Sequence, residues 1–200
     1  MIKCVLFDLG GVLVDFSDDD YFKYLSKVSG KKPKEVEKLL DYWWRRIDLG
    51  LVHIKFFEKR IEKLLKIPKE KVQWIEFYEK RVRLNKGMMN LEKALRKSYT
   101  VAFLSNIDFS RYDIAMSILD MKHFDYDFAS CYMKLRKPDP EIYKVVAKRM
   151  GLKPGEIVFV DNRLDNVLGA RSAGMKALWF KGSRAVLERQ LKKLGLKWGK

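Results

Sequence analysis

The side chain best suited to chemistry is Asp8, which closes the apolar run CVLFD just before the glycine pair Gly10 and Gly11. Glycines let the backbone turn away sharply after a strand, so Asp8 would be exposed to a substrate at the strand end. A carboxylate presented in this way can attack phosphorus and form a covalent intermediate. The same pattern also fits a capping or turn aspartate, and Asp8 alone does not separate the two.

Two further segments carry groups that could bind phosphate. Ser105 and Asn106 end the run VAFLSN, and their hydroxyl, amide and nearby N–H groups suit a phosphoryl oxygen, although Ser-Asn is also ordinary turn chemistry. Lys137 stands in RKPDPEIY before Pro138, which biases it toward an extended conformation. A lysine fixed there could neutralise both a nucleophilic carboxylate and a bound phosphate.

A fourth segment, VFVDNRLDN, clusters oxygen donors directly after an apolar run. Its polar side chains include Asp161, Asn162, Asp165 and Asn166. Mg²⁺ prefers one or two carboxylates together with waters and phosphate, so this cluster suits a magnesium ion. An Asp- and Asn-rich turn that starts a helix is the alternative interpretation.

The elements that must position these residues are short β-rich runs, which alternate with amphipathic segments over residues 1–15 and 87–200. The runs are IKCVLF, YTVAFLS, YDFAS, EIVFVD and MKALWF. This alternation predicts an α/β protein with a doubly wound, Rossmann-like parallel sheet and helices on both faces. The four segments fall at the carboxyl ends of predicted strands, the edge where ligands bind in such sheets.

Residues 16–86 interrupt this pattern and contain almost no strand signal. Three stretches carry apolar residues at helical spacing: KPKEVEKLLDYWWRRIDLG, IKFFEKRIEKLLKI and PKEKVQWIEFYEKRVRLN. We therefore predict an α-helical cap domain over residues 16–86, inserted into a core made of residues 1–15 and 87–200. The C-terminal SRAVLERQLKKLGLKWGK is predicted to be an amphipathic helix that packs on the core.

The composition excludes several classes of protein. The chain has 200 residues, 48% of them hydrophobic, which is enough to bury a core and argues against global disorder. No apolar stretch approaches the roughly 18 residues needed to span a bilayer. The N-terminal run is interrupted by Asp8 and does not fit a signal peptide. We therefore expect a cytoplasmic protein without a membrane partner.

The formal net charge of +16 makes nucleic acid or another polyanion a possible partner. However, the 42 lysine and arginine residues are spread along nearly the whole chain among acidic residues. This distribution is typical of a solvated surface with ion-pair networks, as in thermophilic proteins, and nucleic acid is therefore not favoured.

Taken together and in this order, the four segments resemble the motifs of the haloacid dehalogenase-like (HAD) hydrolase superfamily. The resemblance covers residues 1–15 and 99–181, and GLKPGEIVFVDNRLDNVLGARSAGMKALWF is especially close. Members with a helical cap carry it where residues 16–86 lie. The resemblance implies a Mg²⁺-dependent phosphatase whose partner is a small phosphorylated molecule.

In the phosphatases of that superfamily the first aspartate attacks phosphorus, and water then hydrolyses the aspartyl-phosphate. The resemblance gives this role to Asp8, and it gives Lys137 that of orienting the nucleophile and offsetting charge. It places Mg²⁺ on Asp8, on the backbone carbonyl of Gly10 and on an acid of the fourth segment. The residues expected at the phosphate are Ser105, Asn106 and Gly11.

This chain departs from the family pattern at two positions. Many relatives carry a second aspartate where Gly10 stands, and losing such a general acid typically costs roughly 10²- to 10⁴-fold in rate. Substrates with a good leaving group, such as sugar 1-phosphates or acyl phosphates, would depend least on it. Some relatives also place a metal-binding acid where this chain has Asn162. We expect Asp161 to be the principal metal carboxylate, assisted by Asn162, with Asp165 as an outer acid.

Two other functions fit parts of the pattern. A 2-haloacid dehalogenase uses the same aspartate on carbon without a metal, but Val12, Asp161 and Asp165 depart from what that branch carries. A non-catalytic descendant would keep the fold as a binding module with a basic surface. The two missing acids favour this second alternative, and the retention of Asp8 and Lys137 in their segments opposes it.

The cap selects the substrate in relatives with such an insertion. Arg45 and Arg46 are the candidates to reach the substrate, and because they are adjacent on a helix, at most one is expected to do so. Trp43 and Trp44 are expected to pack between cap helices, and His53 to be structural. A basic, aromatic cap suits an anionic, ring-bearing substrate.

Overall fold

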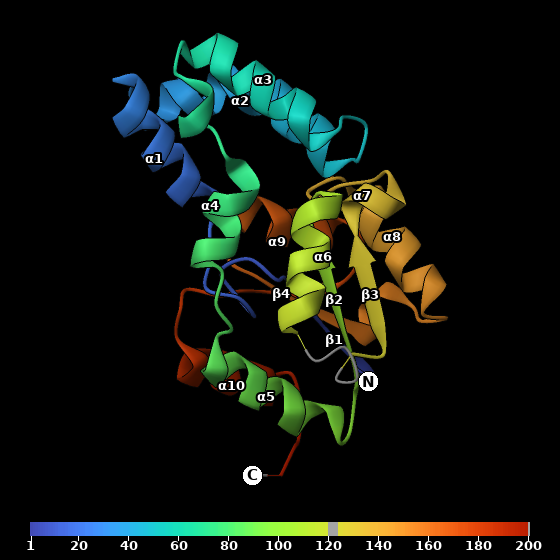
Figure 1. The fold of residues 1–200 in the computed structure, drawn as a ribbon. Coiled ribbons are helices and arrows are strands. Elements are labelled where there is room, and N and C mark those ends of the chain that lie inside the picture. The colour runs from blue at the N-terminus through green and yellow to red at the C-terminus, as the bar shows by residue number, and fades with distance from the viewer. Residues whose placement is uncertain (120–123, 200) are drawn as a thin grey trace.

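The computed structural model describes residues 1–119 and 124–199. At its centre lies a five-stranded sheet of order β3-β2-β1-β4-β5, in which each pair of neighbours is parallel (Figure 1). The predicted doubly wound parallel sheet is confirmed, and each β-rich run of the sequence forms one strand. The strands are β1 (Cys4–Phe7), β2 (Thr100–Ser105), β3 (Tyr126–Ala129), β4 (Ile157–Asp161) and β5 (Lys176–Trp179).

Helices cover both faces of the sheet because successive strand side chains point to opposite sides. Cys4 and Leu6 of β1 pack in one hydrophobic cluster with residues of α8 and α9. Val5 and Phe7 pack in a second cluster with residues of α5, α6 and α10. The core helices are α5 (Lys86–Arg96), α6 (Phe109–Ile118), α7 (Ser130–Met133), α8 (Pro140–Arg149), α9 (Leu164–Ser172) and α10 (Arg184–Lys193).

The segment between β1 and α5 is helical, as its sequence pattern predicts. It forms α1 (Asp18–Ser29), α2 (Pro33–Asp48), α3 (Ile54–Leu65) and α4 (Trp74–Arg81). In Figure 1, α1, α2 and α3 lie together at the end of the molecule toward which the arrowheads of β2 and β3 point. The carboxyl edge of the sheet therefore faces the inserted helices.

Two of these helices differ from the sequence expectation. The pattern did not single out α1, which begins after Ser17: the Ser17 hydroxyl accepts a hydrogen bond from the Asp19 N–H, and three aspartates occupy the favourable first turn. The third helical stretch is broken into a 3₁₀ turn, Lys69–Lys71, and the short helix α4. There the Trp74 N–H donates to Glu58 Oε1 at 2.9 Å, so the helix restarts at a fully buried tryptophan.

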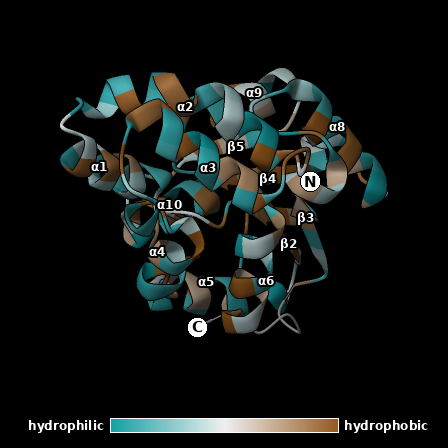
Figure 2. Cartoon of the chain, turned by 45° about the horizontal axis from the view of Figure 1, so that its top comes forward, coloured by the Kyte–Doolittle hydropathy of each residue, from teal (hydrophilic) through white to brown (hydrophobic). Residues whose placement is uncertain are grey.

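The C-terminal helix α10 packs on the core, as predicted, through the buried Leu187 and Leu191. Helices such as α2 and α8 carry both hydrophobic and hydrophilic stretches (Figure 2), as expected for helices with one buried face. Within residues 1–119 and 124–199, none of the helices combines the length and apolar character that crossing a membrane requires.

Candidate active site

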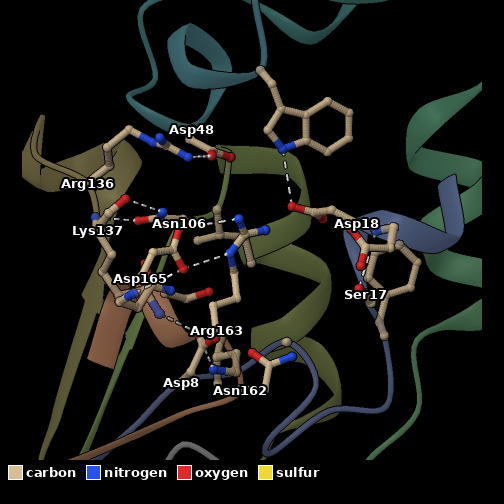
Figure 3. Close-up of a pocket in the computed structure, with 18 of the residues that line it drawn as sticks. Asp8, Ser17, Asp18, Asp48, Asn106, Arg136, Lys137, Asn162, Arg163 and Asp165 are labelled. Carbon is tan, nitrogen blue, oxygen red and sulfur yellow. Dashed lines mark hydrogen bonds and ion pairs between the residues drawn. The ribbon is translucent and has the colours of Figure 1, made fainter. Parts of the chain in front are cut away.

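Three neighbouring strands bring three of the predicted residues to one edge of the sheet. Asp8 follows β1, Ser105 ends β2 and Asp161 ends β4, and β1 lies between the other two strands. Asp8 and Ser105 line a cavity of about 640 Å³, whose walls come from both the core and the inserted helices (Figure 3). The site therefore lies at the carboxyl ends of the strands, as the sequence predicts.

Lys137 joins the two aspartates. Its Nζ lies 2.7 Å from Asp8 Oδ1 and 2.8 Å from Asp161 Oδ2, and it donates a hydrogen bond to the Leu104 carbonyl at 2.9 Å. The side chain is only 1% exposed. A buried ammonium is stable when its charge and its donors are matched in this way. The predicted lysine–nucleophile contact is therefore present.

The backbone around Lys137 is held by the neighbouring helices. The peptide bond to Pro138 is cis, and α8 begins shortly afterwards with Asp139 as its N-cap. In α9, Gly169 lies directly against Pro138, because a Cβ at Gly169 would fall 2.2 Å from the Pro138 carbonyl oxygen. A glycine is required there for α9 to approach this closely.

Burial controls the ionisation of this group of charges. The pKa of Asp8 is raised to about 7, first by burial and then by the negative charge of Asp161, against the opposing effect of Lys137. Burial also works against the charge on Lys137, but Asp161 and Asp8 together hold the pKa of Lys137 above its ordinary value. Lys137 therefore stays protonated while Asp8 titrates near neutrality.

Asn106, which was predicted to bind phosphate, hydrogen-bonds the backbone of Lys137. Its Nδ2 donates to the Lys137 carbonyl at 2.9 Å, and its Oδ1 accepts from the Lys137 N–H at 2.9 Å. Both ends of the amide are thus used to hold the lysine backbone. This geometry makes Asn106 a positioning residue for Lys137. Because Asn106 also lines the cavity, its predicted contact with phosphate stays a prediction.

Asp161, predicted to be the principal metal carboxylate, is also fully engaged. It is 0% exposed and is absent from the residues that line the cavity. Its Oδ2 contacts Lys137 and accepts from Asn166 Nδ2 at 3.0 Å, and its Oδ1 accepts from the Arg163 N–H at 2.7 Å. Asp161 is thus held by three partners behind the cavity wall, and its role as the principal metal carboxylate stays a prediction.

Asn162 lies in the cavity wall, over the glycine turn that follows Asp8. Gly11 has a φ of +72°, and a Cβ at Gly11 would fall 2.2 Å from Asn162 Nδ2. Glycine is therefore required at position 11 both for the backbone conformation and for the approach of Asn162. The Asn162 carbonyl accepts from Trp179 Nε1 at 2.9 Å, which ties this loop to β5.

Of the other predicted core residues, Gly10, Ser105 and Asp165 line the cavity, whereas Gly11, predicted to lie at the phosphate, is not among the lining residues. Ser105 is 4% exposed. Asp165 is half-exposed and pairs with Arg163, its Oδ1 lying 3.3 Å from the arginine Nε. Arg163 was not predicted, because no spacing or motif marked this arginine among many others.

The inserted helices contribute an acidic wall. Of the two adjacent arginines, Arg45 lines the cavity, whereas Arg46 lies elsewhere with its guanidinium over the Tyr42 ring. Arg45 itself pairs with Asp41 at 2.9 Å. The charged residues of this wall are Arg45 and five acids, Asp18, Asp19, Glu37, Asp41 and Asp48. The basic character of the cap as a whole therefore does not extend to this wall, and the anionic substrate inferred from it stays a prediction.

The aromatic residues of the cap have structural roles. Trp44 is 6% exposed, and its Nε1 donates to Asp18 Oδ2 at 3.1 Å, although Trp44 also lines the cavity. Trp43 packs against Phe56. His53 caps α3 by accepting a hydrogen bond from the Lys55 N–H at 3.2 Å. These three residues were predicted to be structural.

A buried ion cluster that the sequence does not reveal connects the inserted helices to the core. Arg111 of α6 is 3% exposed and lies 2.8 Å from Asp18 Oδ1, 2.9 Å from Asp48 Oδ1 and in contact with Asp108. Asp48 also pairs with Arg136 at 3.1 Å. Figure 3 shows Arg136 and Lys137 on one side of the cavity and Asp18 on the other. The pKa of Asp48 is raised to about 6 by burial, in spite of the two arginines.

The described residues offer a limited set of metal donors. No group of three or more His, Cys, Asp or Glu side chains within residues 1–119 and 124–199 is arranged to hold a metal ion. Asp8, Gly10 and Asn162 nevertheless all line the cavity, and residues of these kinds can offer a carboxylate, a backbone carbonyl and a side-chain amide oxygen. Oxygen donors of these kinds fit Mg²⁺, which completes its coordination with waters and phosphate.

A buried Asp–Lys pair at the carboxyl edge of a parallel sheet, beneath inserted helices, is an arrangement that suits a nucleophilic carboxylate. Residues 2–174 match the family described as haloacid dehalogenase-like hydrolase. The chain belongs to this family and is an enzyme, a HAD-like hydrolase.

Three similar proteins each match only part of this chain. Bifunctional epoxide hydrolase 2 of Rattus norvegicus is 32% identical over 117 residues, which are 56% of this chain and 21% of that protein. Flavin mononucleotide hydrolase 1 of Arabidopsis thaliana is 34% identical over 93 residues, 44% and 38% of the two chains. Glyceraldehyde 3-phosphate phosphatase of Pyrococcus furiosus is 37% identical over 71 residues, which are 34% of this chain and 30% of that protein. The matched parts are thus well under half of each relative's length.

Solved structures match nearly the whole chain. A HAD family enzyme from Bacteroides thetaiotaomicron, in complex with magnesium and inorganic phosphate, has a TM-score of 0.75 at 22% identity and covers 94% of this chain and 99% of its own. A HAD-like hydrolase from Porphyromonas gingivalis has a TM-score of 0.78 at 22% identity, covering 98% and 100%. This likeness shows that the fold is shared.

Proposed function

We propose that the protein is a phosphatase that hydrolyses a small phosphorylated molecule, uses Mg²⁺ and forms an aspartyl-phosphate on Asp8. The observation that carries this proposal is the asymmetry of the Asp8 carboxylate. Its Oδ1 contacts Lys137 and accepts from the Leu9 N–H at 2.8 Å, whereas its Oδ2 accepts no hydrogen bond from the described residues. A carboxylate held by one oxygen presents the other to the cavity as a nucleophile.

The side chains around Asp8 support two successive displacements. In the first, Oδ2 bonds to phosphorus, and the bond to the leaving oxygen breaks with its electron pair going to the leaving group. In the second, water attacks the same phosphorus and releases Asp8 as a carboxylate. Lys137 offsets the charge of both carboxylate and phosphoryl group, and Ser105 is placed to donate its hydroxyl to a phosphoryl oxygen. Positioning and charge neutralisation provide most of the catalysis in reactions of this type.

Mg²⁺ would be held by Asp8, the Gly10 carbonyl and the side-chain oxygen of Asn162. When bound, it would supply positive charge that stabilises the phosphoryl oxygens. Magnesium in the structure of the Bacteroides relative supports this part of the proposal, as does the fit of these oxygen donors. The names of two curated relatives, a glyceraldehyde 3-phosphate phosphatase and a flavin mononucleotide hydrolase, support phosphate esters as substrates.

Gly10 provides no acid for the leaving group, so the proposed substrates have leaving groups that depart without protonation. Sugar 1-phosphates and acyl phosphates are of this kind, as is the synthetic p-nitrophenyl phosphate. We expect these esters to be hydrolysed faster than phosphate esters of simple alcohols. The reverse order would contradict this part of the proposal.

The test is a panel of phosphate esters assayed with Mg²⁺ and with EDTA. We expect hydrolysis that depends on Mg²⁺ and that Asp8→Asn abolishes. Asp113→Asn is the matched control, because it makes the same chemical change at an exposed position on α6. Activity that survives Asp8→Asn would disprove the aspartyl-phosphate mechanism. A folded wild-type protein that hydrolyses no member of the panel, but binds nucleic acid in a salt-sensitive way, would favour the non-catalytic alternative.

A further inference from the structure

The residues around the glycine turn carry little negative charge with which to hold a divalent cation. Lys137 lies within 2.8 Å of both Asp8 and Asp161, so these three buried groups together carry one net negative charge when both carboxylates are ionised. Asp161 is fully buried and is not among the residues that line the cavity, and both of its oxygens already contact Lys137, Asn166 or the Arg163 N–H. Asp8 is thus the one carboxylate of this group that lines the cavity.

The two residues that follow Asp161 in the loop, Asn162 and Arg163, add no negative charge to the site. Asn162 is neutral, and it is fixed over the turn because a Cβ at Gly11 would lie 2.2 Å from its Nδ2. Arg163, the following residue, lines the same cavity and adds a positive charge. That charge is matched by Asp165, which is 3.3 Å away, so the pair offers the cation no net attraction.

A phosphate dianion changes this balance. The second pKa of a phosphate monoester is about 6, so above neutral pH the bound group brings two negative charges and several oxygen donors. Mg²⁺ favours sites in which one or two carboxylates are completed by phosphate oxygens. In a buried, low-dielectric site these added charges attract the cation far more strongly than they would in water.

We propose that Mg²⁺ and phosphate bind this site cooperatively, because Asn162 leaves Asp8 as the single carboxylate among the three residues proposed to contact the cation. This inference rests on the proposed function of the site and adds a binding order to it: Mg²⁺ is retained with the phosphorylated substrate and released with inorganic phosphate. Because the coupling between two ligands is reciprocal, Mg²⁺ raises the affinity for phosphate by the same factor.

Isothermal titration calorimetry of the 200-residue protein at pH 8 tests this directly. Mg²⁺ is titrated into the protein alone and into the protein saturated with inorganic phosphate, with the binding of Mg²⁺ to free phosphate subtracted. We expect phosphate to tighten Mg²⁺ binding at least about tenfold. The reverse titration, phosphate into protein with and without Mg²⁺, should give the same factor. Equal Mg²⁺ affinity with and without phosphate, or no Mg²⁺ binding in either state, would overturn the inference.

Asn162→Asp is the decisive variant, because it adds one negative charge with almost no change in shape. We expect it to bind Mg²⁺ alone at least about tenfold more tightly than wild type, with a smaller effect of phosphate. The matched control is Asn90→Asp, which makes the same chemical change at an exposed position on α5 and should leave Mg²⁺ binding unaltered. An unchanged Mg²⁺ affinity in a folded Asn162→Asp protein would also overturn the inference.

The wild-type titrations decide the matter even if the variant does not fold. They are also independent of the test of function. A protein that hydrolyses phosphate esters but binds Mg²⁺ without regard to phosphate contradicts the cooperativity alone. A protein that binds the two cooperatively but hydrolyses nothing contradicts the proposed phosphatase alone.

Discussion

The side-chain amide of Asn106 makes two hydrogen bonds to the backbone of Lys137, which is 31 residues away in sequence. It donates to the Lys137 carbonyl and accepts from the Lys137 N–H, each at 2.9 Å. Through this exchange β2 fixes the backbone of the segment that carries the lysine. The lysine side chain in turn reaches Asp8 on β1 and Asp161 on β4. The position of the ammonium is therefore determined jointly by three neighbouring strands.

Asn106→Ala should reduce both stability and catalysis. It leaves a backbone N–H and a carbonyl of Lys137 without partners, at a cost of about 1–3 kcal/mol for each group that stays buried. We expect a lower free energy of unfolding in urea and a lower kcat, since the lysine is no longer held in place. Asn106→Asp keeps the acceptor but not the donor, and it should fall between Ala and wild type. A rise in KM alone, with stability unchanged, would instead indicate direct phosphate binding.

Asp8→Asn should stabilise the protein more at pH 8 than at pH 5. The pKa of Asp8 rises from its ordinary 3.8 to about 7 on folding, so the folded protein binds this proton more tightly than the unfolded chain. The resulting stability is fully present below about pH 4 and is lost as pH rises through about 7. Asparagine stays neutral throughout, so the difference in melting temperature between variant and wild type should grow with pH.

Melting curves in EDTA from pH 5 to pH 8 measure this difference. Asp113→Asn, on the surface, should show a difference that does not change with pH. If the difference in melting temperature between Asp8→Asn and wild type is constant or shrinks toward pH 8, folding does not raise the pKa of the Asp8 carboxyl.

Gly11→Ala should destabilise the protein more than Gly30→Ala. Both glycines have a positive φ, +72° and +71°, so both substitutions carry the same backbone penalty of about 1–2 kcal/mol. Only at Gly11 does the new Cβ meet another residue, Asn162 at 2.2 Å, whereas no atom lies within 4 Å at Gly30. The difference between their unfolding free energies measures the contact with Asn162. Gly11→Ala combined with Asn162→Ala should remove that difference.

Arg111→Met should loosen the inserted helices. Asp18, Asp48 and Asp108 would lose their shared arginine, and breaking a buried pair costs about 3–5 kcal/mol. Hydrogen exchange should increase in α1 and α2. The control is Arg45→Met, whose 57% exposed side chain pairs with Asp41 and should contribute no more than about 1 kcal/mol. Equal effects of the two substitutions would contradict this assignment.

The features that could be predicted from the sequence depend on local pattern. Each buried strand is a short apolar run, and Asp8, Ser105 and Asp161 each follow or close one. Since parallel strands align their carboxyl ends, placing the runs in one sheet is enough to bring these residues to the same edge. The lysine contact then follows from the chemistry of burying charge.

The features that could not be predicted depend on partners distant in the sequence. Arg111 meets Asp48 and Asp18 from 63 and 93 residues away, and no spacing identifies such partners. Asn106 and Asp161 have the residue types of ligands, but their oxygens are taken by neighbours that only the fold brings close. The acidic cavity wall could not be predicted either. The inserted helices contain many lysines, and only the fold determines that none of these lysines lines the cavity.

The ion pairs around Arg111 limit how the inserted helices can be replaced by those of a related enzyme. Asp18 and Asp48 belong to the inserted helices, while Arg111 and Arg136 belong to the sheet domain. A chimera that receives a foreign helical segment without acids at these two places would leave the partly buried Arg136 without Asp48 and the buried Arg111 with Asp108 as its one remaining partner in this cluster. Grafting a new substrate preference onto this scaffold therefore requires carrying both carboxylates with the graft, or replacing both arginines with it.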